Sequence, residues 1–419
     1  MSGDRISVGR ILDEPLDWRF KGFPAVDGVT VGTVADQAWN VLAGDLPLPA
    51  LVLKEPALVH NLELVSRWCA ERGVLHAPHG KTTMAPQLYE RQIAAGAWAI
   101  TVATAGQARV CRAFGVPRVF LANELVEPVA LQWVADELAA DPAFDFYCLV
   151  DSIAGVDVMT AALEGTERPV QVLVEFGYAG GRTGCRSVET ALEVAAAVGR
   201  SRELVLVGVE GYEAGIAHDR SPDALSALDA VIIRLRNVAL ALDRGGMLEA
   251  RERPIISAGG SAFFDRVVDL LDGDWFGRPI DVVIRPGAYV AHDEGIYREL
   301  SPLAGMLRPA LEIWGAVLSR PEPELALLGF GKRDVPFDAG FPLPHFVYSH
   351  GTLRRVDSLE IFELNDQHAF VRVRPDDPLA VGDFVGCGIS HPCTAFDKWR
   401  LLPVVNDDYT ITEAIATFF

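Results

Sequence analysis

Eight short apolar segments alternate with longer segments of helical periodicity between residues 74 and 287. The apolar segments are rich in β-forming residues, and their alternation with helices predicts parallel strands joined by crossover helices. Eight such units are typical of an α/β protein with a (β/α)8 TIM barrel, in which active sites lie at the C-terminal ends of the strands. The predicted strands span 74–79, 99–104, 118–123, 144–151, 170–176, 204–211, 254–259 and 281–287.

The pattern changes after about residue 301, where short strands and turns replace the helical segments. The stretch "LEIFELNDQHAFVRVR" predicts a hairpin around Asn365 and Asp366. This region predicts a second, mainly antiparallel β domain, to which the N-terminal residues contribute a strand. We therefore expect a barrel over 58–300 and a β domain built from 1–57 together with 301–419.

Composition narrows the classes of partner. Half of the 419 residues are hydrophobic, the formal net charge is -20 and the pI is about 4.9. An exterior of this sign repels nucleic acid and acidic membrane surfaces, so we expect neither as a partner and favour a small-molecule substrate. The six cysteines form no CxxC pair, and the charged N-terminus has no apolar core of signal-peptide length. These features predict a cytoplasmic protein.

Lys81 lies in "HAPHGKTTMAP", just past the end of the first predicted strand. A lysine at this face can be partly desolvated, which lowers the pKa of its amine and suits covalent chemistry with an aldehyde cofactor. A structural lysine on a βα loop is the alternative reading. Position alone leaves both open.

Two glycine-rich loops follow the seventh and eighth predicted strands, "SAGGSAFFD" (257–265) and "RPGAY" (285–289). Barrels commonly bind phosphate in these two places, through backbone N–H groups and a helix N-terminus. Ordinary turns are the alternative, but two such loops at these positions favour a phosphate site.

Two further stretches carry candidate chemistry. "FGYAGGRTG" lacks the GxGxxG spacing, so a nicotinamide oxidoreductase is disfavoured, and Arg182 is either a cation pointing into the barrel mouth or a surface arginine. In "GISHPCTAFDKW", His391 and Cys393 project to one side of an extended segment. They could bind zinc, or they could be a buried cysteine beside a core histidine.

Taken together, "PHGKT", "EFGYAGGRTG", "SAGGS", "RPGAYV" and the late "SHPC" resemble the fold type III pyridoxal-phosphate enzymes with the alanine racemase fold. The likeness is greatest to the branch of D-serine dehydratase and D-threonine aldolase, and it runs from about residue 45 to the C-terminus. It implies that Lys81 is the Schiff-base lysine and that Arg182 and Tyr212 lie beside the cofactor. It further implies zinc ligands His391 and Cys393, and phosphate binding by Gly259, Gly260, Ser261, Gly287, Ala288 and Tyr289.

The resemblance implies a lyase that needs pyridoxal 5'-phosphate and Zn2+ and acts on β-hydroxy D-amino acids such as D-serine, giving keto acid and ammonia. The alternatives are a D-threonine-type aldolase and a non-catalytic pyridoxal-phosphate-binding protein. By analogy we also expect a homodimer. The chain departs from the branch in two places, since Thr82, Thr83 and Met84 follow the lysine and Glu213 replaces an aldolase-type histidine. These departures affect the expected substrate preference.

Overall fold

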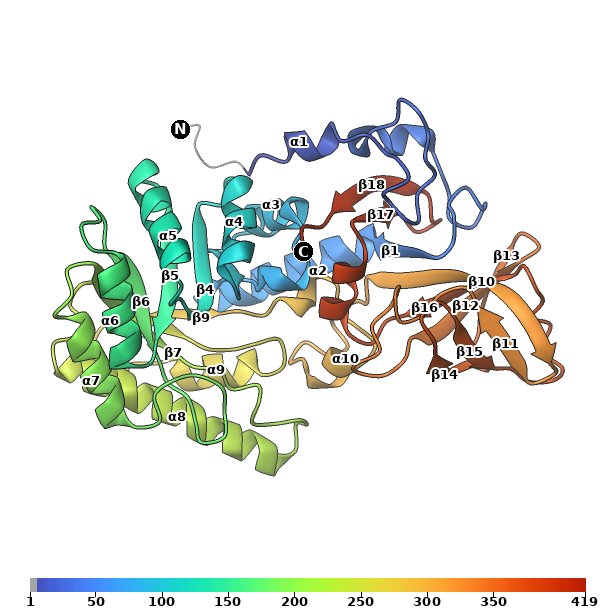
Figure 1. Ribbon diagram of the computed structural model, residues 1–419. Coiled ribbons are helices and arrows are strands. Elements are labelled where there is room, and N and C mark those ends of the chain that lie inside the picture. Colours follow the sequence, from blue (N-terminus) through green and yellow to red (C-terminus); the bar gives the residue numbers. More distant parts are fainter. Residues whose placement is uncertain (1–5) are drawn as a thin grey trace.

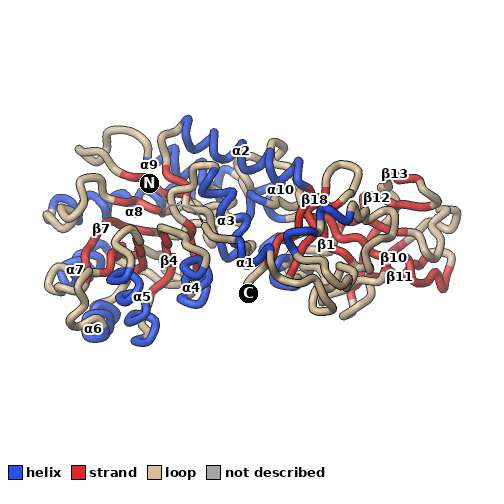
Figure 2. The backbone as a smooth tube through the Cα atoms, turned by 90° about the horizontal axis from the view of Figure 1, so that it is seen from above, coloured by secondary structure: helices blue, strands red, loops and turns tan. Residues whose placement is uncertain are grey.

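The computed structural model describes residues 6–419 and consists of two lobes lying side by side (Figures 1 and 2). One lobe is an eight-stranded parallel barrel surrounded by helices, and the other is built on a ten-stranded, mainly antiparallel sheet. The predicted fold class is confirmed. Of the N-terminal segment assigned to the β domain, the first five residues lie outside the described part.

The parallel sheet closes into a barrel between its first and last members in space. Its strand order is β2-β9-β8-β7-β6-β5-β4-β3, and a parallel bridge from His79 to Thr101 joins the two edges. Backbone hydrogen bonds from Trp98 N to His76 O (2.7 Å) and from Thr101 N to Pro78 O (2.9 Å) complete the closure. The strands are β2 (Leu75–His76), β3 (Ile100–Val102), β4 (Arg118–Glu124), β5 (Asp145–Val150), β6 (Val170–Glu175), β7 (Leu204–Glu210), β8 (Ile255–Ser257) and β9 (Asp281–Ile284).

The helices that cover the barrel begin with local signals in the sequence. The side chains of Thr104, Ser152, Ser187 and Ser221 accept hydrogen bonds from backbone N–H groups at the starts of four helices. The covering helices are α2 (Glu55–Glu71), α3 (Pro86–Ala94), α4 (Ala105–Ala113), α5 (Pro128–Ala140), α6 (Ile153–Ala162), α7 (Val188–Val198), α8 (Pro222–Arg244) and α9 (Phe264–Leu271). No helix among residues 6–419 is long and apolar enough to cross a membrane.

The barrel has its own interior, separate from the core between barrel and helices. Large side chains of Phe120 and Tyr147 fill it together with smaller apolar residues from other strands. A filled interior leaves ligand space only at the ends of the strands. The interior cluster consists of Ala77, Ala99, Phe120, Tyr147, Leu149, Leu173, Val207, Ile255 and Val283.

The second lobe joins the two ends of the chain. In its sheet β1 (Ala50–Lys54) lies between β10 (Leu311–Glu322), to which it is antiparallel, and β17 (Leu401–Val405), to which it is parallel. The hairpin expected around Asn365 and Asp366 is confirmed as β14 (Glu360–Leu364) and β15 (Ala369–Arg372). The remaining strands are β11 (Leu325–Leu328), β12 (Leu343–Ser349), β13 (Thr352–Arg355), β16 (Phe384–Gly388) and β18 (Ile411–Ala416).

Short helices occupy the joints of the chain. The α-helix α1 (Gly9–Leu12) lies near the N-terminus and α10 (Ile296–Leu300) links the barrel to the β lobe (Figure 1). The 3-10 helices are η1 (Val31–Thr33), η2 (Ala35–Gln37), η3 (Gly80–Thr82), η4 (Ala288–Val290), η5 (Pro392–Thr394) and η6 (Phe396–Lys398). Three of these turns, η3, η4 and η5, carry residues singled out in the sequence.

Candidate active site

A cavity of about 190 Å3 lies at the C-terminal end of the barrel strands. Four of the residues singled out in the sequence line it, namely Lys81, Arg182, Tyr212 and Gly260. They come from loops after four different strands, so only the closed barrel brings them together. This is the face at which the fold places catalysis.

Lys81 lies in η3, a turn that fits closely against the barrel. A Cβ atom on Gly80 would be 2.7 Å from Ile100 Cγ2, so the residue before the lysine must be small, and Tyr89 Oη donates a hydrogen bond to Gly80 O (2.8 Å). The Lys81 side chain is accessible from the cavity, but the surrounding protein desolvates it and lowers its pKa. The cations of Arg182 and Arg285 lower this pKa further, while Cys393 opposes them. A lowered amine pKa increases the neutral, nucleophilic fraction.

Arg182 and Tyr212 form one wall of the cavity. The guanidinium carbon of Arg182 lies 4.2 Å from the centre of the Tyr212 ring, in the geometry of a cation–π contact. Burial is the main cause of the raised pKa of Tyr212, so its hydroxyl stays protonated at neutral pH. The pair offers a flat aromatic face and a cation to a bound ring.

The two glycine loops meet beside the lysine turn. Ser261 Oγ accepts hydrogen bonds from Gly287 N and Ala288 N, both at 3.2 Å. A Cβ atom on Gly287 would lie 2.5 Å from His79 O and 2.9 Å from Thr82 Oγ1, so a side chain there would push the loop away from the lysine. One hydroxyl and two amides therefore converge near Lys81, and these are groups that bind a phosphate.

The other residues predicted to bind phosphate have additional partners. The N–H groups of Gly259 and Gly260 each donate to an oxygen of the buried Glu213 carboxylate, both at 2.9 Å. The side chain of Tyr289 turns away from the cavity, and its hydroxyl accepts a hydrogen bond from Gln92 Nε2 (3.2 Å). The amides of Gly287 and Ala288 also have a partner, Ser261 Oγ, but this partner is a neutral hydroxyl and not a carboxylate. A phosphate in this place would therefore be held first by Ser261 and these two amides. Lys81 with this set fits the aldehyde and the phosphate of pyridoxal phosphate.

A buried ion pair at the base of the cavity was missed from the sequence. Arg285 contacts Glu210 and Ser257 Oγ, and the side chains of Arg285 and Glu210 are only 5% and 2% exposed. Burial raises the pKa of Glu210 to about 7, although Arg285 acts in the opposite direction. The sequence did contain a signal for Arg285, because this charged residue directly follows an apolar strand segment and is the first residue of "RPGAY".

Three carboxylates form a second cluster that the sequence analysis did not identify. Glu124, Asp151 and Glu175 lie at or just past the ends of β4, β5 and β6, with oxygens within 4.8 Å of one another. Thr183 Oγ1 donates to Glu175 Oε1 (3.0 Å), and Gly184 N donates to Asp151 Oδ2 (3.0 Å). Burial, followed by the neighbouring carboxylates of Glu175 and Asp151, raises the pKa of Glu124 to about 9. This cluster therefore holds a proton at neutral pH.

The β lobe contributes His391 and Cys393 to the same region. Cys393 is half-buried, whereas the other five cysteines are buried, and its Sγ lies 3.3 Å from Thr82 Oγ1 in the lysine turn. Burial lowers the pKa of His391, but Cys393 and Asp338 outweigh it and raise the pKa to about 9. A thiol and an imidazole side by side are a donor set that suits zinc, so the predicted ligands fit the metal.

Comparison with protein families gives two matches along the chain. The model for the alanine racemase N-terminal domain matches residues 54–268, and the model for a putative serine dehydratase domain matches residues 310–405. The first match covers just over half of the chain and includes Lys81, Arg182, Tyr212 and the first glycine loop. The second match includes His391 and Cys393.

The individual relatives described here are each less than 25% identical to this chain. The chain is 24% identical over 346 residues to 3-hydroxy-D-aspartate aldolase of Paracoccus denitrificans (strain Pd 1222), which covers 81% of this chain and 83% of that protein. The structure is similar to that of D-threonine aldolase from Filomicrobium marinum, with a TM-score of 0.74, 23% identity and coverage of 89% and 95%. It is also similar to D-threo-3-hydroxyaspartate dehydratase from Delftia sp. HT23, with a TM-score of 0.73, 19% identity and coverage of 90% and 99%. The structural likenesses establish the fold.

Proposed function

Since this chain belongs to the alanine racemase-like, fold type III family of pyridoxal-phosphate enzymes, we propose that it is a lyase of β-hydroxy D-amino acids. More specifically, we propose a zinc-dependent dehydratase that releases a keto acid and ammonia from D-serine or a related substrate. The observation that carries the proposal is a contact between the turn that contains Lys81 and the predicted zinc ligands His391 and Cys393. Thr82, next to Lys81, touches Cys393 at 3.3 Å across the two lobes.

The residues of the barrel would hold the cofactor. Lys81 would bind its aldehyde carbon, and Ser261 with the amides of Gly287 and Ala288 would bind its phosphate. Arg182 and Tyr212 would lie beside it. When bound, pyridoxal phosphate withdraws electrons from the substrate Cα and so makes the α-proton acidic.

Lys81 would then serve as the base. The lowered pKa of Lys81 would leave its Nζ neutral, and this amine would accept the Cα proton of a bound substrate. Cys393 is close enough to act on the charge of this amine. The base and the proposed metal ligands are therefore neighbours, as an elimination across Cα–Cβ requires.

His391 and Cys393 would hold the zinc, which supplies a Lewis acid for the β-hydroxyl group. A hydroxyl is a poor leaving group in water, and this assistance is what favours dehydration. The sulfur ligand supports elimination over aldol cleavage. Two structures of the dehydratase relative carry a histidine-to-alanine and a cysteine-to-alanine mutation two positions apart, and the second is a metal-free form.

An aldolase is the second candidate, because the curated relative described above is an aldolase. In that reaction the Cα–Cβ bond breaks and glycine leaves with an aldehyde. The same base and metal pair would serve both reactions. A homodimer also remains a prediction, which light scattering on the eluted peak of a size-exclusion column tests directly.

Product analysis decides between the two reactions. Purified protein with pyridoxal phosphate and zinc is incubated with D-serine, D-threonine and D-threo-3-hydroxyaspartate, and with the L-enantiomers as controls. Keto acid with an equal amount of ammonia establishes the dehydratase, whereas glycine with aldehyde establishes the aldolase. No product from any D-substrate, in protein whose Lys81 becomes labelled by the cofactor on borohydride reduction, would contradict both and favour a binding protein.

A further inference from the structure

Asp338 holds the segment that carries His391 and Cys393 from outside the barrel. It lies in the loop between β11 and β12, more than fifty positions before the histidine. Its Oδ2 accepts a hydrogen bond from His391 Nδ1 (2.7 Å), and its Oδ1 accepts one from Thr394 Oγ1 (2.8 Å). The two oxygens therefore bind the residues on both sides of Cys393.

The position of Asp338 is itself fixed by the surrounding backbone. Ser390 Oγ donates to Gly340 O (2.7 Å), and Asp338 forms a bridge with Gly340, whose φ of +103° favours glycine. Three side-chain hydrogen bonds thus join residues 338–340 to residues 390–394. A carboxylate held in this way has little freedom to turn away from the imidazole.

The contact decides which imidazole nitrogen is available to a metal. An ionised carboxylate only accepts hydrogen bonds, so Nδ1 of His391 must carry the proton in the neutral ring. The lone pair then lies on Nε2. Carboxylates in this position orient metal-binding histidines and raise their basicity in zinc sites generally.

We propose that Asp338 is a positioning residue that selects the Nε2 donor of His391 and orients it, together with Cys393, toward the metal. The inference rests on the proposed function, because it assumes that this pair binds zinc. Asp338 would not touch the metal or the substrate. Its effect would appear in metal affinity rather than in folding, since its side chain is 47% exposed.

Zinc affinity of the full-length protein tests the proposal. Wild type, Asp338→Asn and Asp338→Glu are loaded with pyridoxal phosphate and titrated with zinc against a chromogenic chelator. We expect Asp338→Asn to bind zinc about 10- to 100-fold more weakly and Asp338→Glu to recover part of the loss. Asp366→Asn is the matched control, because Asp366 is an exposed aspartate of the same lobe that pairs with the exposed Arg333 at 3.5 Å. It should bind zinc like wild type.

Each result has one meaning. Wild-type affinity in Asp338→Asn overturns the inference and leaves the proposed function intact. Equal losses in the Asn and Glu variants, or a parallel loss of pyridoxal-phosphate binding in Asp338→Asn, assign the effect to loop packing and also overturn it. A wild type that binds no zinc removes the metal from the proposed function, and the inference with it.

Discussion

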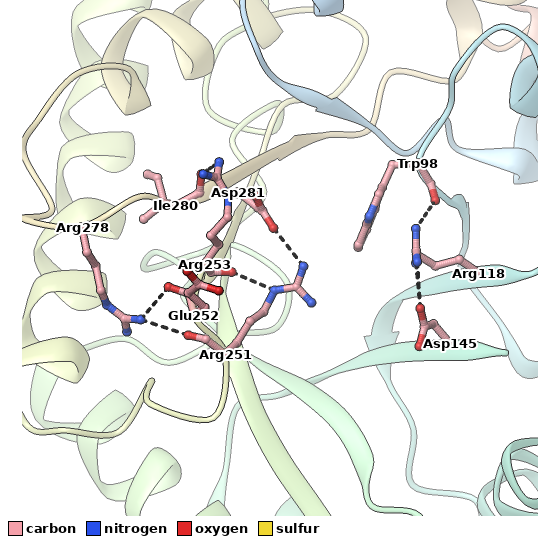
Figure 3. Close-up of polar contacts among 9 residues, drawn as sticks. All are labelled: Trp98, Arg118, Asp145, Arg251, Glu252, Arg253, Arg278, Ile280 and Asp281. Carbon is pink, nitrogen blue, oxygen red and sulfur yellow. Dashed lines mark hydrogen bonds and ion pairs between the residues drawn. The ribbon is translucent and has the colours of Figure 1, made fainter. Parts of the chain in front are cut away.

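The two ends of the barrel differ in how their ionisable side chains are paired. At the N-terminal end the charges are paired close to the strand starts, with Arg118 2.9 Å from Asp145 and with Arg251 and Arg253 at 2.9 Å and 2.7 Å from Asp281 (Figure 3). At the C-terminal end ionisable groups line a cavity, and among the described residues Lys81 and Arg182 form no ion pair. Glu124, which holds a proton at neutral pH, has both oxygens buried without a hydrogen-bond partner in the described part of the chain.

This difference distinguishes the N-terminal end, whose ion pairs stabilise the barrel, from the C-terminal end, which has the features of an active site. Burial and neighbouring charges lower the pKa of Lys81 and His79 and raise that of Glu124, all at the C-terminal end. Groups shifted in this way cluster at functional sites. Substitutions at the C-terminal end should therefore mainly reduce activity, and substitutions at the N-terminal end should mainly reduce stability.

Replacing Lys81 should give the largest effect. Lys81→Ala removes both the proposed attachment point and the proposed base, and we expect the rate of product formation to fall by about 10⁴-fold or more. The melting temperature should stay within a few degrees of wild type, because a desolvated amine is removed. Steady-state kinetics and thermal unfolding measure the two quantities. A variant with more than a tenth of wild-type activity would remove Lys81 from the mechanism.

The Arg285–Glu210 pair is the exception that sharpens the comparison, because it is buried at the C-terminal end yet its two opposite charges contact each other. Arg285→Met leaves the Glu210 carboxylate without its partner, and such losses cost about 3–5 kcal/mol of unfolding free energy. The double variant Arg285→Met/Glu210→Gln should recover most of this stability, since no charge remains unpaired. Denaturant unfolding of the three proteins tests this. Equal stabilities of the single and double variants would contradict the pairing argument.

The fold and part of the site follow from local sequence patterns. The eight apolar segments are each continuous in sequence, so their periodicity predicted β2 to β9. Lys81, Arg182 and the glycine loops were selected as candidates because each follows a strand end, where this fold places ligands. His391 and Cys393 were selected because they are two positions apart.

The remaining site residues depend on contacts that no local pattern contains. Glu124, Asp151 and Glu175 become one cluster only when three strands lie side by side, and each alone is an ordinary acidic residue. The sequence identified Glu213 only as a departure from the pattern of the branch. Its carboxylate accepts hydrogen bonds from the amides of Gly259 and Gly260, which lie in the next loop of the barrel. Such pairings depend on tertiary structure, and one sequence does not reveal them.

At the N-terminal end the expected effect is smaller and concerns stability. Asp281→Asn removes the carboxylate that pairs with both Arg251 and Arg253, and we expect a loss of about 1 kcal/mol because the arginines are partly exposed. Activity should be unchanged, since this end lies away from the cavity. Chemical unfolding and initial rates measure both. A large loss of activity without a loss of stability would break the proposed division between the two ends.

A further effect is expected at Glu124, where it depends on pH. The pKa of about 9 in the folded protein lies above the usual 4.5, so between these values the folded form holds a proton that the unfolded chain releases. Stability should therefore fall as pH rises from about 5 to about 9, and Glu124→Gln should remove this contribution. Thermal unfolding at pH 5.5, 7 and 8.5 should give the variant a melting temperature a few degrees above that of wild type. This difference should increase with pH. An exposed control, Glu249→Gln, should show no such trend. A constant difference across pH would mean that Glu124 is ionised throughout, and the C-terminal end would then resemble the paired end more closely than its geometry indicates.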